Sequence, residues 1–392
     1  MKIQIESSRL AKACAWASKN IPSKPLLPIM GNLYIVANND VISITSTDNE
    51  VWTMQSIPAT VVLDDTPSAF CINAANLTSL LQAIPSQPIV IELKARKQAN
   101  EYGLPCFYAT IKHSSGTSEL PVDNADEYPS LNPVKGVDYS VSAEVLKQSI
   151  ETCRFALFPD ATLYPQMASL CLHFKGNSMV AVATDKNIIA RLENPDVEGP
   201  EDQFMLPKKC LSLVMPAIDD LLKDKQAMDV VLLRREGNRV CIQMDSTAIY
   251  CLQTEMKYPK YDSVIPDKKY FVYEAVVNRK DMLSAIMRAA LFTNAESMKL
   301  DFEFHANENY VDVVGECIDF ATSSKERVTC EFKGEGNFKI AFRATYLKDL
   351  LSHLSSEEVR FYMINHSRQT VIAEEHGNPN VLMLIMPMIL NY

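Results

Sequence analysis

Two Thr-Asp pairs are the residues of this chain that most resemble catalytic carboxylates. Thr47-Asp48 and Thr184-Asp185 each follow a run of alternating apolar residues that is typical of a β-strand. Because both pairs occupy the same place in a repeated pattern, we interpret them as turns in which Asp accepts backbone N–H groups. No Gly-rich phosphate loop, GxSxG or HExxH motif accompanies them. The sequence therefore predicts no catalytic residue and no enzyme.

Metal and redox chemistry are also disfavoured by residue type and spacing. The six His residues are scattered without a pair at ligand spacing, and the ten Cys residues contain no CxxC pair. Most Cys residues lie in apolar strand or helix patterns, where a thiol acts as a small hydrophobic group. There is neither an export signal nor an apolar run long enough to span a membrane. We expect a cytoplasmic protein with reduced cysteines, no metal and no cofactor.

The elements that position these residues recur three times. An amphipathic helix, a β-hairpin, a second helix and an aromatic residue or Met before Pro return with a period near 130 residues. A period of this length is that of a whole domain rather than of a solenoid repeat. The helices, hairpin turns and closing pairs are marked, in order, by Leu10, Leu146 and Leu283, by Asn38–Asp40, Lys175–Asn177 and Asn307–Asn309, and by Tyr128-Pro129, Tyr258-Pro259 and Met386-Pro387.

The repeat predicts both the domain organisation and the fold class. Polar, Pro-containing segments near residues 133–136 and 266–269 separate the periodic stretches. We therefore expect three similar domains at residues 1–136, 137–267 and 268–392. Each contains many alternating strands and only two helices, which favours an α+β fold with two helices on antiparallel β-sheets.

Charge is distributed unevenly over these elements. The whole chain has a formal net charge of −10, which by itself argues against nucleic acid as a partner. We expect helices at residues 8–24, 72–84, 143–158, 207–215, 278–294 and 343–353, and these hold thirteen Lys and Arg against four Asp and Glu. Scattered basic residues on helices suit phosphate contacts, which carry no base sequence information. The pattern predicts an electropositive helical surface that binds duplex DNA.

Several short motifs make the chain similar to one known family. The segment 24–33, Lys-Pro-Leu-Leu-Pro-Ile-Met-Gly-Asn-Leu, resembles the Pro-x-Leu-Pro-Ile-Leu-x-Asn signature of the bacterial DNA polymerase III beta subunit, the sliding clamp. Further matches fall in the family's order along the whole chain. They are Ser46–Glu50, Asp126–Pro129, Phe155-Ala156, Ala183–Asp185, Tyr258–Pro266 and Met386–Met388.

This resemblance implies a fold, an assembly and a set of partners. It implies three clamp domains per chain that form a half ring, and a head-to-tail homodimer that closes around duplex DNA. The implied function is that of a DNA polymerase processivity factor, a non-catalytic subunit. The implied partners are double-stranded DNA bound without sequence preference, the polymerase III alpha subunit, the clamp loader and other proteins with a clamp-binding motif.

The resemblance also assigns three sets of residues. The DNA-binding set is Arg9, Lys12, Lys24, Arg154, Lys208, Lys209, Arg288 and Arg343. The peptide-binding groove between the second and third domains is lined by Pro165, Thr184, Ile189, Pro259, Val264, Leu384, Met386, Pro387 and Met388. The dimer interface joins Leu120 of one chain to Leu291 and Phe292 of the next.

The chain departs from the family pattern at the groove. The usual Thr-Asp-Gly-His-Arg-Leu-Ala is here Thr184-Asp185-Lys186-Asn187-Ile188-Ile189-Ala190, and the usual Met-Pro-Met-Arg-Leu end is Met386-Pro387-Met388-Ile389-Leu390. Two arginines and a histidine are thus replaced. The alternative to a housekeeping clamp is therefore a specialised or decoy paralogue with altered peptide partners.

Overall fold

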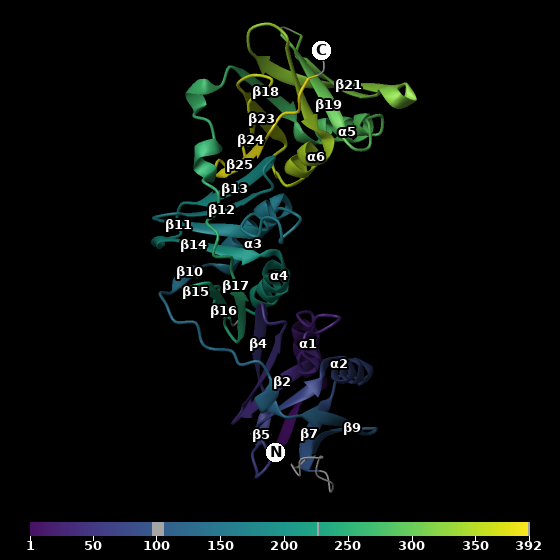
Figure 1. Ribbon diagram of the computed structural model, residues 1–392, viewed down its shortest axis with the longest axis vertical. Helices are drawn as coiled ribbons and strands as arrows, with labels where there is room; N and C mark the ends of the chain where they lie inside the picture. Colours follow the sequence, from purple (N-terminus) through teal and green to yellow (C-terminus); the bar gives the residue numbers. More distant parts are fainter. Residues whose placement is uncertain (96–105, 226, 307, 391–392) are drawn as a thin grey trace. The chain divides into compact units, whose positions relative to one another are not determined.

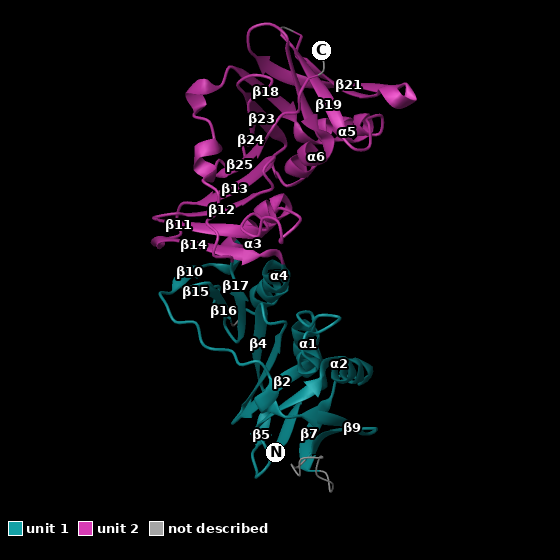
Figure 2. Cartoon of the chain, viewed as in Figure 1, with its two compact units in different colours: residues 1–144, 209–253 teal, residues 145–208, 254–392 magenta. Residues whose placement is uncertain are grey.

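The structure is a computed structural model that describes residues 1–95, 106–225, 227–306 and 308–390. Asn307, which belongs to the third predicted hairpin turn, lies outside the described residues. The chain contains two compact units (Figure 2): unit 1 comprises residues 1–144 and 209–253, and unit 2 comprises residues 145–208 and 254–392. The division into three domains at residues 136 and 267 stays a prediction.

The first third of the chain lies wholly in unit 1. Two helices alternate with antiparallel strands, as the repeat predicts, and α1 and α2 lie side by side (Figure 1). The elements are β1 (Lys2–Glu6), α1 (Ser7–Ser18), β2 (Asn32–Asn38), β3 (Val41–Thr47), β4 (Val51–Pro58), β5 (Thr60–Val62), β6 (Ala69–Asn73), α2 (Ala74–Ala83), β7 (Pro88–Ala95), β8 (Phe107–His113) and β9 (Gly116–Asp123).

The second and third parts of the chain repeat this order among the described residues. Each has one strand, a helix, four strands, a second helix and three strands, and the first part differs only by the extra strand β5. The second part contains β10 (Tyr139–Val141), α3 (Ala143–Cys153), β11 (Ser169–Gly176), β12 (Met179–Thr184), β13 (Ile188–Asn194), β14 (Gly199–Pro207), α4 (Lys208–Lys223), β15 (Val231–Glu236), β16 (Arg239–Met244) and β17 (Thr247–Leu252). The third contains β18 (Tyr273–Asn278), α5 (Arg279–Ala290), β19 (Lys299–His305), β20 (Tyr310–Cys317), β21 (Thr322–Lys333), β22 (Phe338–Arg343), α6 (Ala344–Ser352), β23 (Glu358–Met363), β24 (Thr370–Glu375) and β25 (Val381–Ile385).

All strand pairs described in the two units are antiparallel, which confirms the α+β prediction. In unit 1 the strand order is β10-β15-β16-β17-β4-β3-β2-β6-β9-β8-β7-β1-β5, and in unit 2 it is β14-β11-β12-β13-β25-β24-β23-β18-β21-β20-β19-β22. Strands from different parts of the repeat therefore join one sheet, through β17 and β4 in unit 1 and through β13 and β25 in unit 2.

The helices pack an apolar stripe onto these sheets. In α1 the residues Leu10, Ala13, Cys14 and Ala17 are buried, at the spacing of one helix face. Nine of the ten cysteines are buried, and burial raises the pKa of the Cys14 thiol to about 12. The Cys14 thiol therefore stays protonated, and the buried cysteines act as small core residues.

Several helix ends differ from the sequence prediction, and those of α1 and α4 differ most. The first helix ends at Ser18 rather than at residue 24, and Lys19 and Lys24 lie beyond it. The fourth helix continues to Lys223 rather than stopping at residue 215, although Pro216 lies inside it. The buried face of the helix continues from Leu213 past the proline to Ile218 and Leu221. Burial of these side chains therefore outweighs the loss of the backbone hydrogen bond that Pro216 cannot donate.

Candidate functional site

The turn between β12 and β13 is built by the Thr184-Asp185 pair. Asp185 Oδ1 accepts the backbone N–H groups of Asn187 and Ile188, both at 2.9 Å. Thr184 Oγ1 donates to the carbonyl of Ile188 at 2.7 Å and accepts from Lys186 N at 3.2 Å. These bonds confirm that the pair is a structural turn, because the Asp carboxylate is occupied by backbone donors.

The turn after β3 in unit 1 has the same chemistry. Asp48 Oδ1 accepts from the backbone N–H groups of Glu50 at 3.0 Å and Val51 at 2.8 Å. Thr47 Oγ1 donates to the Val51 carbonyl at 3.0 Å and accepts from Asn49 N at 2.9 Å. The two units therefore contain one turn motif at equivalent places of the repeat.

Lys186 takes an unusual position at the second turn. Its φ angle is 84°, a conformation that favours glycine, and the family motif has Gly there. The Lys186 ammonium lies 3.3 Å from the ring centroid of Tyr164 and 5.3 Å from that of Phe158. This cation–π contact ties the turn to the loop that carries Pro165. Sequence analysis missed Tyr164 and Phe158, since nothing in the local pattern pairs that loop with Lys186.

An apolar floor lies beside this turn in unit 2. The cross-strand pair Ile189 and Leu384 joins β13 to β25, and Tyr258 donates its hydroxyl to the Val182 carbonyl at 3.2 Å. The buried residues of the cluster are Cys171, Val180, Val182, Ile189, Met205, Tyr258, Tyr261, Val371 and Leu384. Ile189 and Leu384 of this core cluster are also predicted groove residues.

The nine predicted groove residues all lie in unit 2, at different depths. Thr184, Ile189 and Leu384 are buried, whereas Val264 is 40% exposed and Met386 36% exposed. Pro165, Pro259, Pro387 and Met388 are half-buried. Two backbone hydrogen bonds hold the segment that contains Met386 and Met388. Met386 N donates to the Asn187 carbonyl at 2.8 Å, and Met388 N donates to the Ala341 carbonyl at 2.7 Å. The predicted groove residues thus include both buried and exposed side chains.

Polar side chains of the third part of the chain contact the turn between β12 and β13. The Asn187 amide donates to the Tyr346 hydroxyl at 3.1 Å, and the Arg343 guanidinium lies 5.7 Å from the Tyr346 ring centroid. Burial, together with the nearby Asp185 carboxylate, raises the pKa of Tyr346. The hydroxyl therefore stays protonated near neutral pH. Sequence analysis missed Tyr346 because its contacts come from a strand turn that is distant in the chain.

The predicted cationic residues of unit 1 are partly neutralised by acidic neighbours. Arg9 and Lys12 lie on α1, Lys24 lies in the loop after it, and Lys209 is near the start of α4. Lys12 pairs with Asp220 at 3.0 Å, while Lys209 forms an ion pair with Asp48 and donates to the Asn20 carbonyl at 3.2 Å.

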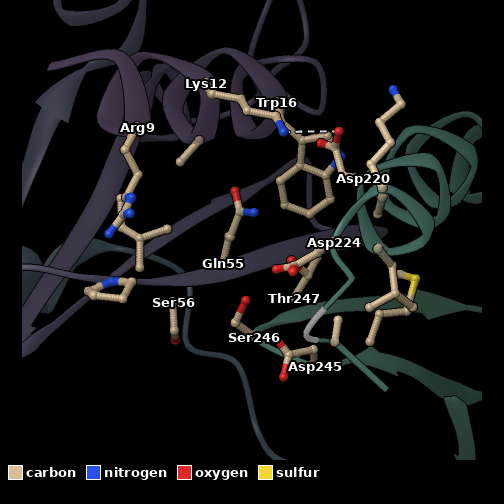
Figure 3. Close-up of a pocket in the computed structure, with 18 of the residues that line it drawn as sticks. Arg9, Lys12, Trp16, Gln55, Ser56, Asp220, Asp224, Asp245, Ser246 and Thr247 are labelled. Atoms are coloured by element: carbon tan, nitrogen blue, oxygen red, sulfur yellow. Dashed lines mark ion pairs between the residues drawn. The ribbon is translucent and has the colours of Figure 1, made fainter. Parts of the chain in front are cut away.

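Figure 3 shows Arg9, Lys12 and Trp16 of α1 across a pocket from Asp220 and Asp224. The pocket has a volume of about 770 Å³. Its walls carry both signs of charge.

The cationic residues of unit 2 are similarly divided. Arg154 and Lys208 are exposed and make no ion pair within the described ranges. Arg288 pairs with Glu326 at 2.6 Å, and Arg343 Nε donates to Thr345 Oγ1 at 3.2 Å.

The helical charge excess is smaller than the sequence predicts. The six helices of the described chain hold ten Lys and Arg against six Asp and Glu, a net charge of +4 rather than +9. Two changes explain the difference: the lengthened α4 takes in two aspartates and one lysine, and four predicted basic residues lie outside the helices. The helices remain more basic than the rest of the chain, but their excess of positive charge is smaller than predicted.

Among the described residues the terminal strands β5, β10, β14 and β22 have an unpaired outer edge, and β9 and β21 inside the sheets are unpaired along most of one edge. Strand β9 pairs with β8 along its length but with β6 only through Val122 and Asp123. Strand β21 pairs with β20 through Thr322–Thr329 and with β18 only through Cys330–Lys333. Such open edges can accept another strand.

Exposed apolar residues lie near the open edge of β21. Leu291 is 80% and Phe292 38% exposed after α5, and Ile318 and Phe320 before β21 are 83% and 79% exposed. Leu120, the predicted partner, is half-buried on β9. Ile318 and Phe320 were missed, although an apolar-polar-apolar triplet at a strand end was a signal for them. Exposed apolar groups of this size mark interaction surfaces.

Models of one protein family match both ends of the chain. The N-terminal domain of the DNA polymerase III beta subunit matches residues 1–132, and its C-terminal domain matches residues 262–389. Together the two models cover more than half of the chain.

Curated relatives and solved structures extend over the whole length. The beta sliding clamps of Synechocystis sp. and Bacillus subtilis are each 24% identical, over 401 and 408 residues, with 99% of both chains covered. The beta sliding clamp homolog GriR of Streptomyces muensis is 23% identical over 397 residues, again with 99% of both chains covered. The sliding clamp of Pseudomonas aeruginosa bound to griselimycin has a TM-score of 0.87 at 19% identity, and that of Bacillus subtilis 0.86 at 21%, with full coverage of both chains.

Proposed function

Because the chain belongs to the DNA polymerase III beta subunit family, the non-catalytic sliding clamps, we propose that two copies close into a ring around duplex DNA. The ring tethers the replicative polymerase and so makes synthesis processive. Family membership along the whole chain is the observation that carries this proposal. Among the described residues no helix is long and apolar enough to cross a bilayer. We infer a cytoplasmic location, where the bacterial chromosome is replicated.

The open strand edges supply the contact that closes the ring. The β9 edge carries Leu120, and the β21 edge lies near Leu291 and Phe292. A β9 edge of one chain that meets the β21 edge of the next makes a head-to-tail contact, which generates a ring when the rotation closes. The exposed apolar side chains near the β21 edge would be buried in this contact.

The cationic residues act on DNA as a weak, mobile contact. Arg9, Lys24, Arg154 and Lys208 are available to phosphates, whereas Lys12, Lys209, Arg288 and Arg343 first have to leave an internal partner. Phosphate contacts depend on salt and not on base sequence. Weak contact is sufficient here because closure of the ring, rather than affinity, retains the clamp.

The groove of unit 2 receives peptides of the partner proteins. The polymerase III alpha subunit, the clamp loader and other proteins with a clamp-binding motif would place Leu and Phe side chains on the floor formed by Ile189 and Leu384. Met386 and Met388 at the rim adapt their shape to different anchors. We assign the groove to extended peptides of the form Gln-x-x-Leu-x-Phe.

The altered groove supports a second candidate function, that of a specialised clamp. Lys186 covers the Tyr164 ring, and Ile188 and Ile389 replace arginines of the family motif. Loss of charge-assisted bonds lowers affinity for the common peptide by about ten-fold or more. A paralogue with its own partners would show this weakened binding together with full ring closure.

Light scattering tests the proposal at the level of assembly. The chain has a mass of 43.9 kDa, and we expect a species of twice that mass at micromolar concentration. A monomer under these conditions would contradict the proposed ring.

A further inference from the structure

A small apolar pocket in unit 1 shares no lining residue with the predicted groove of unit 2. Its volume is about 150 Å³, and Trp52, Leu131, Val134, Arg239, Tyr250 and Leu252 are among the residues that line it. Val134 is buried, and the other five side chains are half-buried. A volume of this size is large enough for a benzene-sized apolar group.

This pocket occupies the place in unit 1 that the groove occupies in unit 2. Strand β4 follows the Thr47-Asp48 turn, as β13 follows the Thr184-Asp185 turn. Tyr250 of β17 pairs with Trp52 of β4, and Leu384 of β25 pairs with Ile189 of β13.

The remaining lining residues correspond in the same way. Leu252 lies two residues beyond Tyr250, as Met386 lies two beyond Leu384. Val134 follows Tyr128-Pro129 at the distance at which Val264 follows Tyr258-Pro259. The internal repeat therefore places apolar residues at five equivalent positions in the two sites: Trp52, Leu131, Val134, Tyr250 and Leu252 against Ile189, Tyr261, Val264, Leu384 and Met386.

We propose that this unit 1 pocket is a second docking site for an extended peptide of a protein partner, which inserts one Leu-sized side chain. Trp52 and Tyr250 at this pocket are larger than Ile189 and Leu384 at the equivalent positions of unit 2. The pocket therefore takes a single anchor rather than the pair of anchors in a Gln-x-x-Leu-x-Phe peptide.

Polar groups at the pocket determine which peptide residues fit next to the Leu-sized side chain. Trp52 Nε1 is buried and has no acceptor among the described residues, so a peptide carbonyl reached by a small ring rotation would satisfy it. The Arg239 guanidinium donates to the Asn132 carbonyl at 3.3 Å and to Glu236 at 2.6 Å. Its five N–H donors leave capacity for a further carboxylate. The fitting peptide is one with an acidic residue next to its Leu.

Fluorine NMR can observe this pocket directly, because the chain has only two tryptophans, Trp16 and Trp52. The full chain is labelled with fluorotryptophan, and a Trp16→Phe variant assigns the two signals. The probe is the acetylated hexapeptide Ala-Asp-Leu-Asp-Ala-Ala, titrated into a Met386→Glu background that blocks the groove of unit 2. We expect the Trp52 signal to shift saturably and the Trp16 signal to stay in place.

Two controls make the result decisive. Leu131→Glu puts a charge in the pocket and should weaken the response at least about ten-fold, while Val137→Glu, at a site 60% exposed outside the pocket, should not change it. A probe with Ala in place of Leu should not shift the Trp52 signal, which keeps the test valid if Leu131→Glu impairs folding.

No Trp52 shift at millimolar peptide, or an equal shift with the Ala probe, would overturn the proposal. This site goes beyond the proposed clamp function, and its failure leaves ring assembly and peptide binding in unit 2 untouched. Those are measured separately by light scattering and by calorimetry on a chain with Met386 intact.

Discussion

Asp312 in unit 2 shows how single residues set the stability of this chain. Its side chain is only 1% exposed and contacts His305 Nε2 at 3.0 Å, Lys325 Nζ at 2.9 Å and Arg327 Nε at 3.1 Å. Burial raises the pKa of Asp312, but the hydrogen bonds from Lys325 and Arg327 outweigh it, so the pKa is lowered overall. The folded state therefore stabilises the ionised carboxylate.

Asp312→Ala should lower the free energy of unfolding by about 1.5–3 kcal/mol near neutral pH, because a hydrogen-bonded charge is lost. The folded pKa lies below the unfolded value of about 3.9, so this contribution is full above that pH and is lost as pH falls through the folded pKa. Urea unfolding at several pH values measures it, with exposed Glu335→Ala as the control. A wild-type advantage that grows in acid would contradict the assignment.

Met386 is the residue whose truncation should most directly weaken peptide binding in the groove. Met386→Ala should reduce the affinity for a Gln-x-x-Leu-x-Phe peptide by about ten-fold, since a partly exposed apolar wall is lost. The melting temperature should change little. Calorimetry measures the affinity, with Met287→Ala, 54% exposed on α5, as the matched control. Equal binding by both variants would place the pocket elsewhere.

At this scale the sequence was informative only where the contacts are local. The Thr-Asp turns could be predicted because each Asp bonds backbone groups within three residues. The ion pairs of Lys12 and Lys209 and the contact of Lys186 with Tyr164 could not be predicted, because they depend on partners that are distant in the chain.

The helices and strands follow the repeat closely, and their differences have physical causes. Residue spacing predicted all six helices, but not the continuation of α4 past Pro216, which depends on burial of Ile218 and Leu221. The pairings β17–β4 and β13–β25 join distant segments and have no local signal. The open edges of β9 and β21 likewise have no local signal in the sequence.

The open edge of β21 leads to a prediction for assembly. Leu291→Glu together with Phe292→Glu should leave monomers at micromolar concentration, because unpaired charges buried in an apolar contact cost about 3–5 kcal/mol. Leu163→Glu, at a site 64% exposed in unit 2, adds a charge away from this edge and should keep the dimer. Light scattering compares the three proteins. Intact dimers in the double variant would exclude this edge as the interface.

The basic residues around α1 lead to a prediction for DNA. Duplex binding should be weak, independent of sequence and steeply reduced by salt, because phosphate contacts release counterions. Arg9→Ala with Lys24→Ala should lower the slope of log affinity against log salt by about two. Lys2→Ala, which removes one charge on β1, should not change it. Fluorescence anisotropy at several salt concentrations measures the slope, and an unchanged slope in the double variant would contradict the DNA-binding role.

At the scale of the whole molecule, the function we propose depends on closure of a ring rather than on a reactive group. The chain is 24% identical to the Synechocystis and Bacillus clamps over nearly its full length. The fold is nevertheless similar to that of the Bacillus subtilis clamp, with a TM-score of 0.86. Family motifs made the clamp identity predictable, whereas the reduced helical charge of +4 was not, because it depends on where helices end.

Retention on circular DNA tests the central claim most directly. The clamp is loaded onto a nicked circular plasmid by the clamp loader of the same organism and is then passed through gel filtration in high salt. We predict that it stays with the circle and is released when a single restriction cut makes the DNA linear, because only topology holds it. A clamp that stays on the linear DNA, or that never stays on the circle, would contradict the account.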